Sequence, residues 1–473
     1  MSAAIQSSQP GAAPVPSTSP LASGAGGRAI AFGPAGAVAL STFLAHVRGL
    51  AVRLPAQPFV LNLCEDRYRF LVAFCAAALR GQVTLLPPAR TRTAIDEVRL
   101  QHPESYCLGD GDPCGCEALS SLSHYLRVPE ALTSCEGGPL RIEDDAVVAI
   151  GFTSGSTGAP GPNPKTWGGF RVSNTQNLAA LADLWPAGAV PQIVATVPPQ
   201  HMYGMELSVL LPLQGGAAVH GGRPFFPQDI ARALQEAAGP RLLVTTPVHL
   251  RALVDAAAQA DTMTLPPLAG IVSATAPLPQ ALAAEAEARF GCEVRELFGS
   301  TETCIIARRR SAREEAWTPL PGVRLQPQLD GTLVHAAHLA APVALADLVE
   351  SEPDGSFRLR GRQADLLEIA GKRASLADLS RRLLAIPGVE DGVVFQLDAR
   401  GAGRVGRIAA LVVAPDLSEE QITAALRAAV DPVFLPRPLR RVPALPRNET
   451  GKLPRAALLG MLQGNIDGSP RSH

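Results

Sequence analysis

The chain contains only three lysines, and each lies in a segment whose residue types suit phosphate chemistry. Lys165, Lys372 and Lys452 stand against 39 arginines among 473 residues. Codon bias explains most of this ratio, since alanine, glycine and proline are also abundant. It does not explain which lysines remain, because a compact ammonium and a planar guanidinium are not interchangeable where a single point charge is needed. The three positions are therefore candidate sites.

A loop of small and hydroxylated residues follows the apolar run 147–152. The loop consists of Thr153, Ser154, Gly155, Ser156, Thr157 and Gly158. Glycines and hydroxyl side chains let N–H and O–H groups approach phosphate oxygens closely, so we expect a phosphate-binding loop. Taken alone, the segment also fits a flexible surface loop. A P-loop kinase or NTPase is a rival because Lys165 follows, but Pro164 stands where a Walker A motif requires glycine.

A second group of candidates follows the strand-like run 293–297. Residues 298–302 read Phe-Gly-Ser-Thr-Glu and supply an aromatic face, hydroxyl groups and a carboxylate. Near the end of the chain, Lys452 lies beside Gly451 in a predicted turn. A positive charge at that place can stabilise two anions that must approach each other, such as a carboxylate and the phosphate that it attacks. A solvated surface lysine is the alternative.

The elements that must position these residues alternate between short apolar runs and amphipathic segments. Strand–helix pairs are expected at 59–64 with 66–80, at 242–246 with 247–258, and at 270–273 with 279–290. This alternation predicts an α/β fold with a parallel sheet. A change of character near 361–364 predicts a domain boundary. We expect a disordered leader over 1–27, a large domain over 28–361, a hinge over 362–365 and a small α+β domain over 366–473.

Composition limits the classes of function. The chain is 47% hydrophobic and 18% charged with a net charge of −1, which predicts a globular protein without an electrostatic footprint for nucleic acid or anionic membrane. It has no apolar run of about 18 residues, so we expect no membrane span. Cys107, Cys114, Cys116 and Cys135 raise the question of a metal site, but their spacing lacks paired C-x-x-C motifs. Reduced thiols in the cytoplasm are the expectation.

The ordered set of motifs resembles the acyl-adenylate-forming superfamily, which includes acyl- and aryl-CoA ligases, luciferases and the adenylation domains of peptide synthetases. The resemblance covers roughly residues 40–460. It implies a large N-terminal adenylating domain with mixed and parallel sheets flanked by helices, and a small mobile α+β C-terminal domain. It also implies an AMP-forming acid–thiol ligase that uses ATP and Mg²⁺.

The resemblance implies a role for each nucleotide-binding position. The loop 153–158 would bind the β- and γ-phosphates, Thr301 the α-phosphate, and Glu302 would bind Mg²⁺ as a hard oxygen ligand. Phe298 would stack on adenine and Asp347 would accept hydrogen bonds from the ribose. The remaining nucleotide contacts are implied for Lys165, Thr275, Ala276, Pro277, Gly299, Ser300, Arg362 and Lys452.

The same resemblance implies an acyl pocket and a second half-reaction. Lys452, His201 and Thr301 would be the catalytic residues, with His201 beside the substrate carboxylate. Lys372 would face the active site during thioester formation, after the small domain has rotated about the hinge. The acyl pocket would be lined by His201, Tyr203, Gly204, Ser273, Ala274 and Gly299. Small residues there suit a flat aromatic ring, although a short aliphatic acid would also fit.

Departures from the family pattern refine this interpretation. Gly161 follows Pro160 where the family usually has lysine, and Lys165 comes later in a proline-rich segment. This longer form looks like the short ligases of aryl-polyene and xanthomonadin pigment pathways, which load a hydroxybenzoate onto an acyl carrier protein; free CoA is the alternative acceptor. Ala364 and Glu368 also depart from the usual hinge pattern, which keeps a non-catalytic acyl-binding relative open as a rival.

Overall fold

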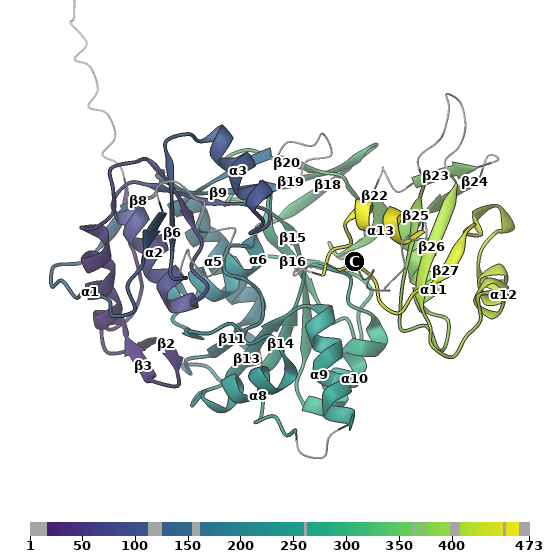
Figure 1. Ribbon diagram of the computed structural model, residues 1–473, viewed down its shortest axis with the longest axis horizontal. Coiled ribbons are helices and arrows are strands. Elements are labelled where there is room, and N and C mark those ends of the chain that lie inside the picture. Colours follow the sequence, from purple (N-terminus) through teal and green to yellow (C-terminus); the bar gives the residue numbers. More distant parts are fainter. Residues whose placement is uncertain are drawn as a thin grey trace, which may run out of the picture.

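The computed structural model describes residues 17–111, 125–153, 161–259, 263–362, 366–369, 372–397, 407–447 and 451–462. Figure 1 shows a large body formed by the described residues between 17 and 362, with a smaller body of yellow-green elements beside it. This arrangement confirms the expected α/β fold with mixed and parallel sheets flanked by helices.

The first sheet of the large body has six strands in the order β10-β9-β5-β4-β6-β7. Its strands pair in parallel, except that β10 returns antiparallel along β9. The bounds are β4 Phe59–Asn62, β5 Val83–Leu86, β6 Ser105–Gly109, β7 Tyr125–Arg127, β9 Val147–Thr153 and β10 Gly161–Thr166.

The second sheet has nine strands in the order β17-β16-β15-β14-β13-β11-β12-β2-β3. Its centre, from β15 to β2, is parallel, and hairpin partners run antiparallel at both edges. The bounds are β2 Ala29–Gly33, β3 Gly36–Ala39, β11 Gln192–Ala195, β12 Ala218–His220, β13 Arg241–Thr245, β14 Gly270–Ser273, β15 Val294–Ser300, β16 Cys304–Arg309 and β17 Thr318–Pro319.

Helices cover both faces of the second sheet, which explains why its strands are apolar without alternation. In β13, Leu242 and Val244 belong to the cluster shared with the first sheet, whereas Leu243 packs with the outer helices. Successive side chains of a strand point to opposite faces, so both sets are buried. The helices of the large body are α1 Leu40–Ala51, α2 Arg67–Leu79, α3 Arg92–Gln101, α5 Trp167–Leu181, α6 Met202–Met205, the π-helix η3 Glu206–Leu210, α7 Leu211–Gln214, α8 Pro227–Gln235, α9 Pro247–Gln259 and α10 Gln280–Phe290.

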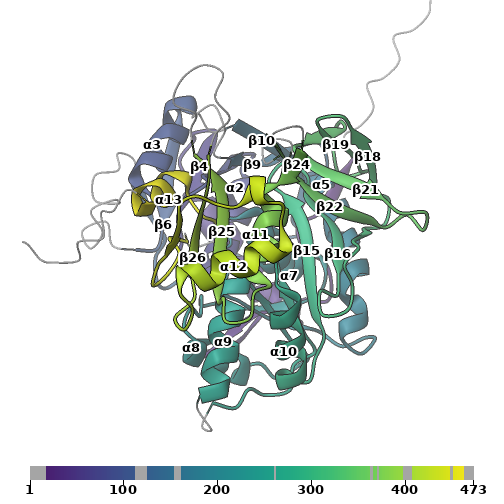
Figure 2. The same ribbon diagram turned by 90° about the vertical axis from the view of Figure 1, so that its right-hand side faces the viewer.

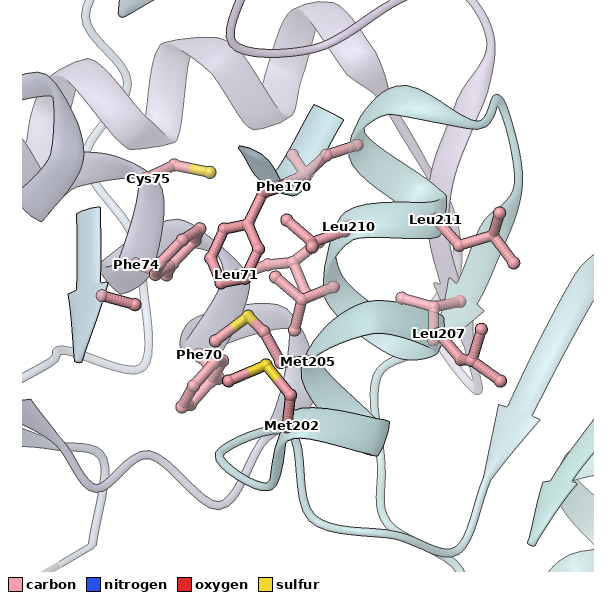
Figure 3. Close-up of a cluster of buried hydrophobic side chains, with 14 of the residues drawn as sticks. Phe70, Leu71, Phe74, Cys75, Phe170, Met202, Met205, Leu207, Leu210 and Leu211 are labelled. Atoms are coloured by element: carbon pink, nitrogen blue, oxygen red, sulfur yellow. The ribbon is translucent and has the colours of Figure 1, made fainter. Parts of the chain in front are cut away.

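The largest core cluster lies between the two sheets. Figure 3 shows Met202 of α6 and Met205 reaching towards Phe70 of α2, with Phe170 of α5 close by. All four side chains are at most 7% exposed. This packing fixes the α6–η3 segment, which begins directly after His201, against the rest of the large body.

Short antiparallel pairs complete the large body and lead to its end. They are β1 Thr18–Pro20 with β8 Arg141–Glu143, β18 Arg324–Gln328 with β19 Gly331–His335 and β20 Val343–Leu345, and β21 Asp347–Ser351 with β22 Phe357–Arg362. The β1–β8 pair corrects the expected leader over 1–27. Residues 17–27 belong to the large body, because β1 pairs with β8 and Leu21 is fully buried in the main core.

The small body has its own buried clusters, drawn only from residues 367–462. In Figure 2 its elements lie in front of the large body. They are β23 Leu366–Ile369, β24 Lys372–Ser375, α11 Leu376–Leu384, β25 Asp391–Gln396, β26 Ile408–Val413, α12 Glu419–Ala429, β27 Leu439–Arg441 and α13 Arg455–Leu462. Residues 363–365 of the expected hinge lie outside the described residues.

Candidate active site

Several predicted site segments begin where parallel strands of the second sheet end. Thr245, the last residue of β13, is the register partner of Ser273, the last residue of β14, and β11 ends beside β13. Parallel strands end at one edge of a sheet, where α/β proteins bind ligands. The segment 198–204, which carries part of the predicted acyl pocket, and the segment 273–278, which carries the predicted adenine contacts, therefore come together at this edge.

The turn between β15 and β16 carries Thr301 and Glu302. It is closed by Ser300 and Thr303, whose backbone N–H groups each donate to the other's hydroxyl at 3.2 Å. Gly299 must be glycine here, because a Cβ would lie 2.2 Å from the Cys304 carbonyl oxygen. The turn therefore has a defined shape that presents two polar side chains.

The strand before the predicted phosphate loop lies against this turn. A Cβ added at Gly151 of β9 would lie 2.6 Å from Thr301 Cγ2 and 3.2 Å from Met202 Cε. Thr153 ends β9, whereas Ser154, Gly155, Ser156, Thr157 and Gly158 lie outside the described residues. The fold thus brings the beginning of the loop and the 298–302 segment together, although they are far apart in the sequence.

Lys165 lies on β10 and points into the protein. The residue is 8% exposed, and its ammonium donates to the carbonyl oxygen of Glu302 at 2.7 Å. Lys165, the candidate lysine of the phosphate segment, thus contacts the backbone of the turn that carries Glu302, the predicted metal ligand.

Phe298 and the ribose candidates lie on the side of the site next to β21 and β22. The Phe298 ring is partly buried and lies 5.5 Å from the Trp317 ring and 6.1 Å from the Phe357 ring, centroid to centroid. Asp347 and Arg362 are direct register partners in the β21–β22 pair. The structure therefore joins the two predicted ribose-side residues through one hairpin.

The adenine segment and the C-terminal lysine turn also meet. Thr275 has φ of +81°, which is an unfavourable conformation for a β-branched residue and is typical of constrained sites. A Cβ added at Gly451 would lie 3.5 Å from Val248 Cγ2 and 3.9 Å from Ala276 Cβ. Gly451, with φ of +78°, thus brings the exposed Lys452 next to the segment 275–277.

The predicted acyl pocket combines an aromatic wall with a buried hydroxyl group. Tyr203 is 7% exposed and donates to the Val272 carbonyl at 2.9 Å, and burial holds the pKa of its phenol well above the usual value. Ser273 is fully buried, and its Oγ has no hydrogen-bond partner among the described residues. A Cβ at Gly204 would lie 2.0 Å from the Pro198 carbonyl oxygen, so the chain turns tightly beside His201. Ala274 is 7% exposed and follows Ser273 at the strand end.

Two buried polar residues near the site were not predicted from the sequence. Glu206 is fully buried at the start of η3, and His249 of α9 is 7% exposed and lies 2.8 Å from Thr246 Oγ1. Burial raises the pKa of Glu206 and lowers that of His249 to about 4. A carboxylate within the largely apolar run 202–213 was the sequence signal that could have identified Glu206.

The other predictions concern the small body and possible metal ligands. Lys372 lies on β24, opposite Ile369 of β23. Cys107 is buried in β6 and Cys135 is partly buried, whereas Cys114 and Cys116 lie outside the described residues. In the ranges that the structure describes, no group of three or more His, Cys, Asp or Glu side chains could hold a metal ion.

The turn at 300–303 fits Mg²⁺ and a nucleotide phosphate. Among the described residues, the Glu302 carboxylate has no hydrogen-bond or ion-pair partner, and both Thr301 and Glu302 are partly exposed. A single carboxylate together with phosphate oxygens is the ordinary environment of Mg²⁺ in nucleotide sites. Glu302 is therefore the side chain here that would hold the ion.

Comparisons with known proteins agree with this geometry. The sequence profile described as AMP-binding enzyme matches residues 55–326. A 4-coumarate–CoA ligase of Rhodobacter capsulatus is 32% identical over 66% of this chain and 76% of its own length. A 3-hydroxybenzoate–CoA/4-hydroxybenzoate–CoA ligase of Thauera aromatica is 24% identical over 75% of this chain and 73% of its own length.

The fold is also that of a solved adenylating enzyme. The o-succinylbenzoate-CoA synthetase of Bacillus subtilis, in complex with its acyl-adenylate intermediate, has a TM-score of 0.76 at 18% identity, covering 91% of this chain and 95% of that chain. The chain belongs to the AMP-binding enzyme family. It is an adenylating enzyme of the AMP-forming acid–thiol ligase class, with ATP and Mg²⁺ as its cofactors. None of its described helices has the length and apolarity that a membrane crossing requires.

Proposed function

We propose that the enzyme activates a hydroxybenzoate as its adenylate and transfers the acyl group to the phosphopantetheine thiol of an acyl carrier protein. The observation that carries the choice of acid is the Ser273 hydroxyl, which is buried without a partner among the described residues and directly follows Val272, whose carbonyl accepts from the Tyr203 hydroxyl. A buried hydroxyl without a partner costs about 1–3 kcal/mol, which a hydroxylated ligand would recover. Relatives named for 4-coumarate and for hydroxybenzoates support an aromatic acid.

In the first half-reaction, a carboxylate oxygen attacks the α-phosphorus and the bond to the β-phosphate oxygen breaks, so that pyrophosphate leaves. His201 orients the carboxylate, and Thr301 donates its hydroxyl to the α-phosphate. Lys452 approaches from the small body and stabilises the negative charge that gathers between the two anions. Glu302 would hold Mg²⁺, which would supply neutralisation of charge on the triphosphate.

In the second half-reaction, the small body rotates about residues 362–365, which withdraws Lys452 and brings the β24 hairpin with Lys372 to the site. The thiol sulfur then attacks the acyl carbon, the bond from that carbon to the phosphate oxygen breaks, AMP leaves and the thiol proton passes to solvent. The proline-rich form of the 160–166 segment supports a carrier protein as the thiol donor. The small domain also has fourteen lysine and arginine residues against ten acidic ones between 366 and 462, which suits an acidic carrier.

Free CoA is the second candidate acceptor, because the relatives from Rhodobacter and Thauera are named as CoA ligases. A pyrophosphate-release assay with a panel of benzoates and short fatty acids, and with holo-carrier protein and CoA as separate acceptors, tests the proposal. We expect hydroxybenzoate-dependent pyrophosphate and acyl transfer to the carrier. Preference for a fatty acid would refute the acid, and faster transfer to CoA would refute the acceptor.

The same assay addresses the remaining rivals. A P-loop NTPase would release orthophosphate without any acid, and a non-catalytic acyl-binding relative would release neither product. Either result would overturn the proposed reaction as a whole.

A further inference from the structure

The turn that carries Thr301 and Glu302 is held by hydrogen bonds from three separate parts of the chain. The Lys165 ammonium donates to the Glu302 carbonyl, and His338 donates through Nε2 to the Thr303 carbonyl at 2.7 Å. The backbone N–H of Ile305, just beyond the turn, donates to the Glu206 carboxylate at 3.0 Å. These contacts all involve main-chain atoms of the turn and leave the side chains of Thr301 and Glu302 partly exposed.

Glu206 has an unusually complete set of donors for a buried carboxylate. Besides Ile305, its Oε1 accepts from Ser173 Oγ at 2.6 Å and from Asn177 Nδ2 at 3.0 Å. A fully buried carboxylate is retained only where hydrogen bonds and a nearby cation offset its desolvation. Burial raises the pKa of Glu206, and the charge of Lys165 acts in the opposite direction.

Cys304 lies in the chain between the two main-chain groups that Lys165 and Glu206 hold, the Glu302 carbonyl and the Ile305 N–H. Cys304 ends the turn with φ of +60°, a conformation that an L-residue holds only where its surroundings enforce it. The two buried side chains therefore hold main-chain groups on either side of this residue.

We propose that Lys165 and Glu206 form a buried positioning pair for the metal-binding turn, and that Lys165 is not a ligand of the nucleotide phosphates. Lys165 holds the Glu302 carbonyl, Glu206 holds the Ile305 N–H, and each charge compensates the other across Cys304. The pair fixes the direction of the Glu302 carboxylate and so determines how readily the site accepts Mg²⁺. This inference depends only on the adenylating activity of the family and not on the identity of the acid.

The scarcity of lysine makes a direct test possible on the unaltered chain. With lysine labelled by ¹⁵N, only three side-chain ammonium signals exist, and Lys372→Arg and Lys452→Arg assign two of them without touching Lys165. A buried ammonium that donates to a carbonyl exchanges its protons slowly, so we expect one protected signal in the ligand-free protein. That signal should persist when a non-hydrolysable ATP analogue is added in EDTA. A Lys165 signal that becomes protected only after nucleotide is added would overturn the proposal.

Variants test the functional consequence by a binding measurement that needs no acid. We expect Lys165→Met and Glu206→Gln each to raise the Mg²⁺ concentration for half-maximal binding of the ATP analogue at least about fivefold. In EDTA, both should bind the analogue within about twofold of the wild type. A phosphate ligand would behave differently, because Lys165→Met would then weaken binding in EDTA and Glu206→Gln would change nothing.

Two further comparisons separate positioning from a general structural role. The double variant Lys165→Met/Glu206→Gln should be no worse than the more affected single variant, since residues of one network are not additive. Lys165→Arg should resemble Lys165→Met, because the bulkier guanidinium does not fit the site of a side chain that is only 8% exposed. A lysine that bound phosphate would instead tolerate replacement by arginine.

The exposed pair Arg251 and Glu285, whose closest atoms are 3.4 Å apart, provides the control. Arg251→Met and Glu285→Gln should leave the Mg²⁺ response unchanged. Additive effects at Lys165 and Glu206, or full activity of Lys165→Arg, would contradict the pair.

Discussion

Asp347 and Arg362 lie directly opposite each other, as register partners at one end of the β21–β22 pair. The Thr332 hydroxyl donates to the Asp347 carbonyl at 2.6 Å and fixes the start of β21. Opposed residues of an antiparallel pair have their Cα atoms about 4.5–5.5 Å apart. The proposed ribose-binding carboxylate and the residue that begins the proposed hinge are thus mechanically connected through one hairpin.

The Asp347 carboxylate is expected to contribute to ATP binding. Because hydrogen bonds to a charged group are worth about 1.5–3 kcal/mol, Asp347→Ala should lower kcat/KM for ATP by about 10- to 100-fold. Glu350→Ala, on the same strand, removes a carboxylate that pairs with Arg360 at the surface and is the matched control. Initial-rate kinetics of pyrophosphate release measure kcat/KM for ATP in both variants. An equal loss of kcat/KM in the two variants would contradict the assignment of Asp347 to ribose binding.

Lys452 is expected to act in adenylation alone. Removing a positioned charge from the transition state costs about 10²- to 10³-fold in kcat, so Lys452→Ala should lose that much in pyrophosphate release. Transfer from supplied hydroxybenzoyl-adenylate to the thiol should stay within about threefold of the wild type. Arg455→Ala, which removes an exposed cation three residues away in α13, should change neither rate. A parallel loss of both half-reactions in Lys452→Ala would argue against the domain rotation.

Ser273 is expected to distinguish hydroxylated from plain benzoates. Its fully buried Oγ has no described partner, so Ser273→Ala should raise the free energy of unfolding of the ligand-free enzyme by about 1 kcal/mol. The same change should raise KM for the preferred hydroxybenzoate about tenfold while leaving benzoate nearly unaffected. Urea unfolding and substrate kinetics test the two parts. An equal change in KM for both acids would show that the Ser273 hydroxyl does not recognise the hydroxyl substituent of the ring.

His249 should make the fold sensitive to mild acid. Burial, together with the charge of Arg223, lowers its pKa to about 4, below the value of about 6.5 in an unfolded chain. The unfolded state therefore binds more protons between pH 6.5 and 4, so stability is lost as the pH falls through that window, by up to about 3 kcal/mol. Urea unfolding of wild type and His249→Gln at pH 4.5 and 7.5 measures the difference. The variant should lose less stability than the wild type over this range, whereas His335→Gln, at a surface histidine bonded to Gln326, should follow the wild type.

Local pattern was enough to predict the strand–helix units around the site. The pairs β4–α2, β13–α9 and β14–α10 form within a few residues of the expected bounds. The periodicity of apolar residues and the positions of turn residues indicate which side chains of a short segment are buried. This local information is enough to predict where these strand–helix pairs begin and end. The fold class and the membership in an adenylating family followed from the same local segments in their order along the chain.

Contacts between distant segments determined features of the site that the local sequence pattern could not predict. The sequence placed Lys165 after a phosphate loop, but only the antiparallel return of β10 directs its ammonium to the Glu302 carbonyl. Residues 17–20, polar and rich in small side chains, resembled a leader until β8 offered them a partner. In both cases the determining contact joins segments more than 100 residues apart.

The amino-acid sequence by itself determined the chemistry available to this protein: three lysines, an acidic turn, a hydroxyl-rich loop and the order in which they occur. The tertiary structure decided which of these groups meet, because only the folded sheets bring β9, β10, η3 and the β15–β16 turn to one place. It also decided the surroundings of each charge. Glu206 is an ordinary glutamate in the sequence, and burial among Ser173, Asn177 and the Ile305 N–H makes it part of the site.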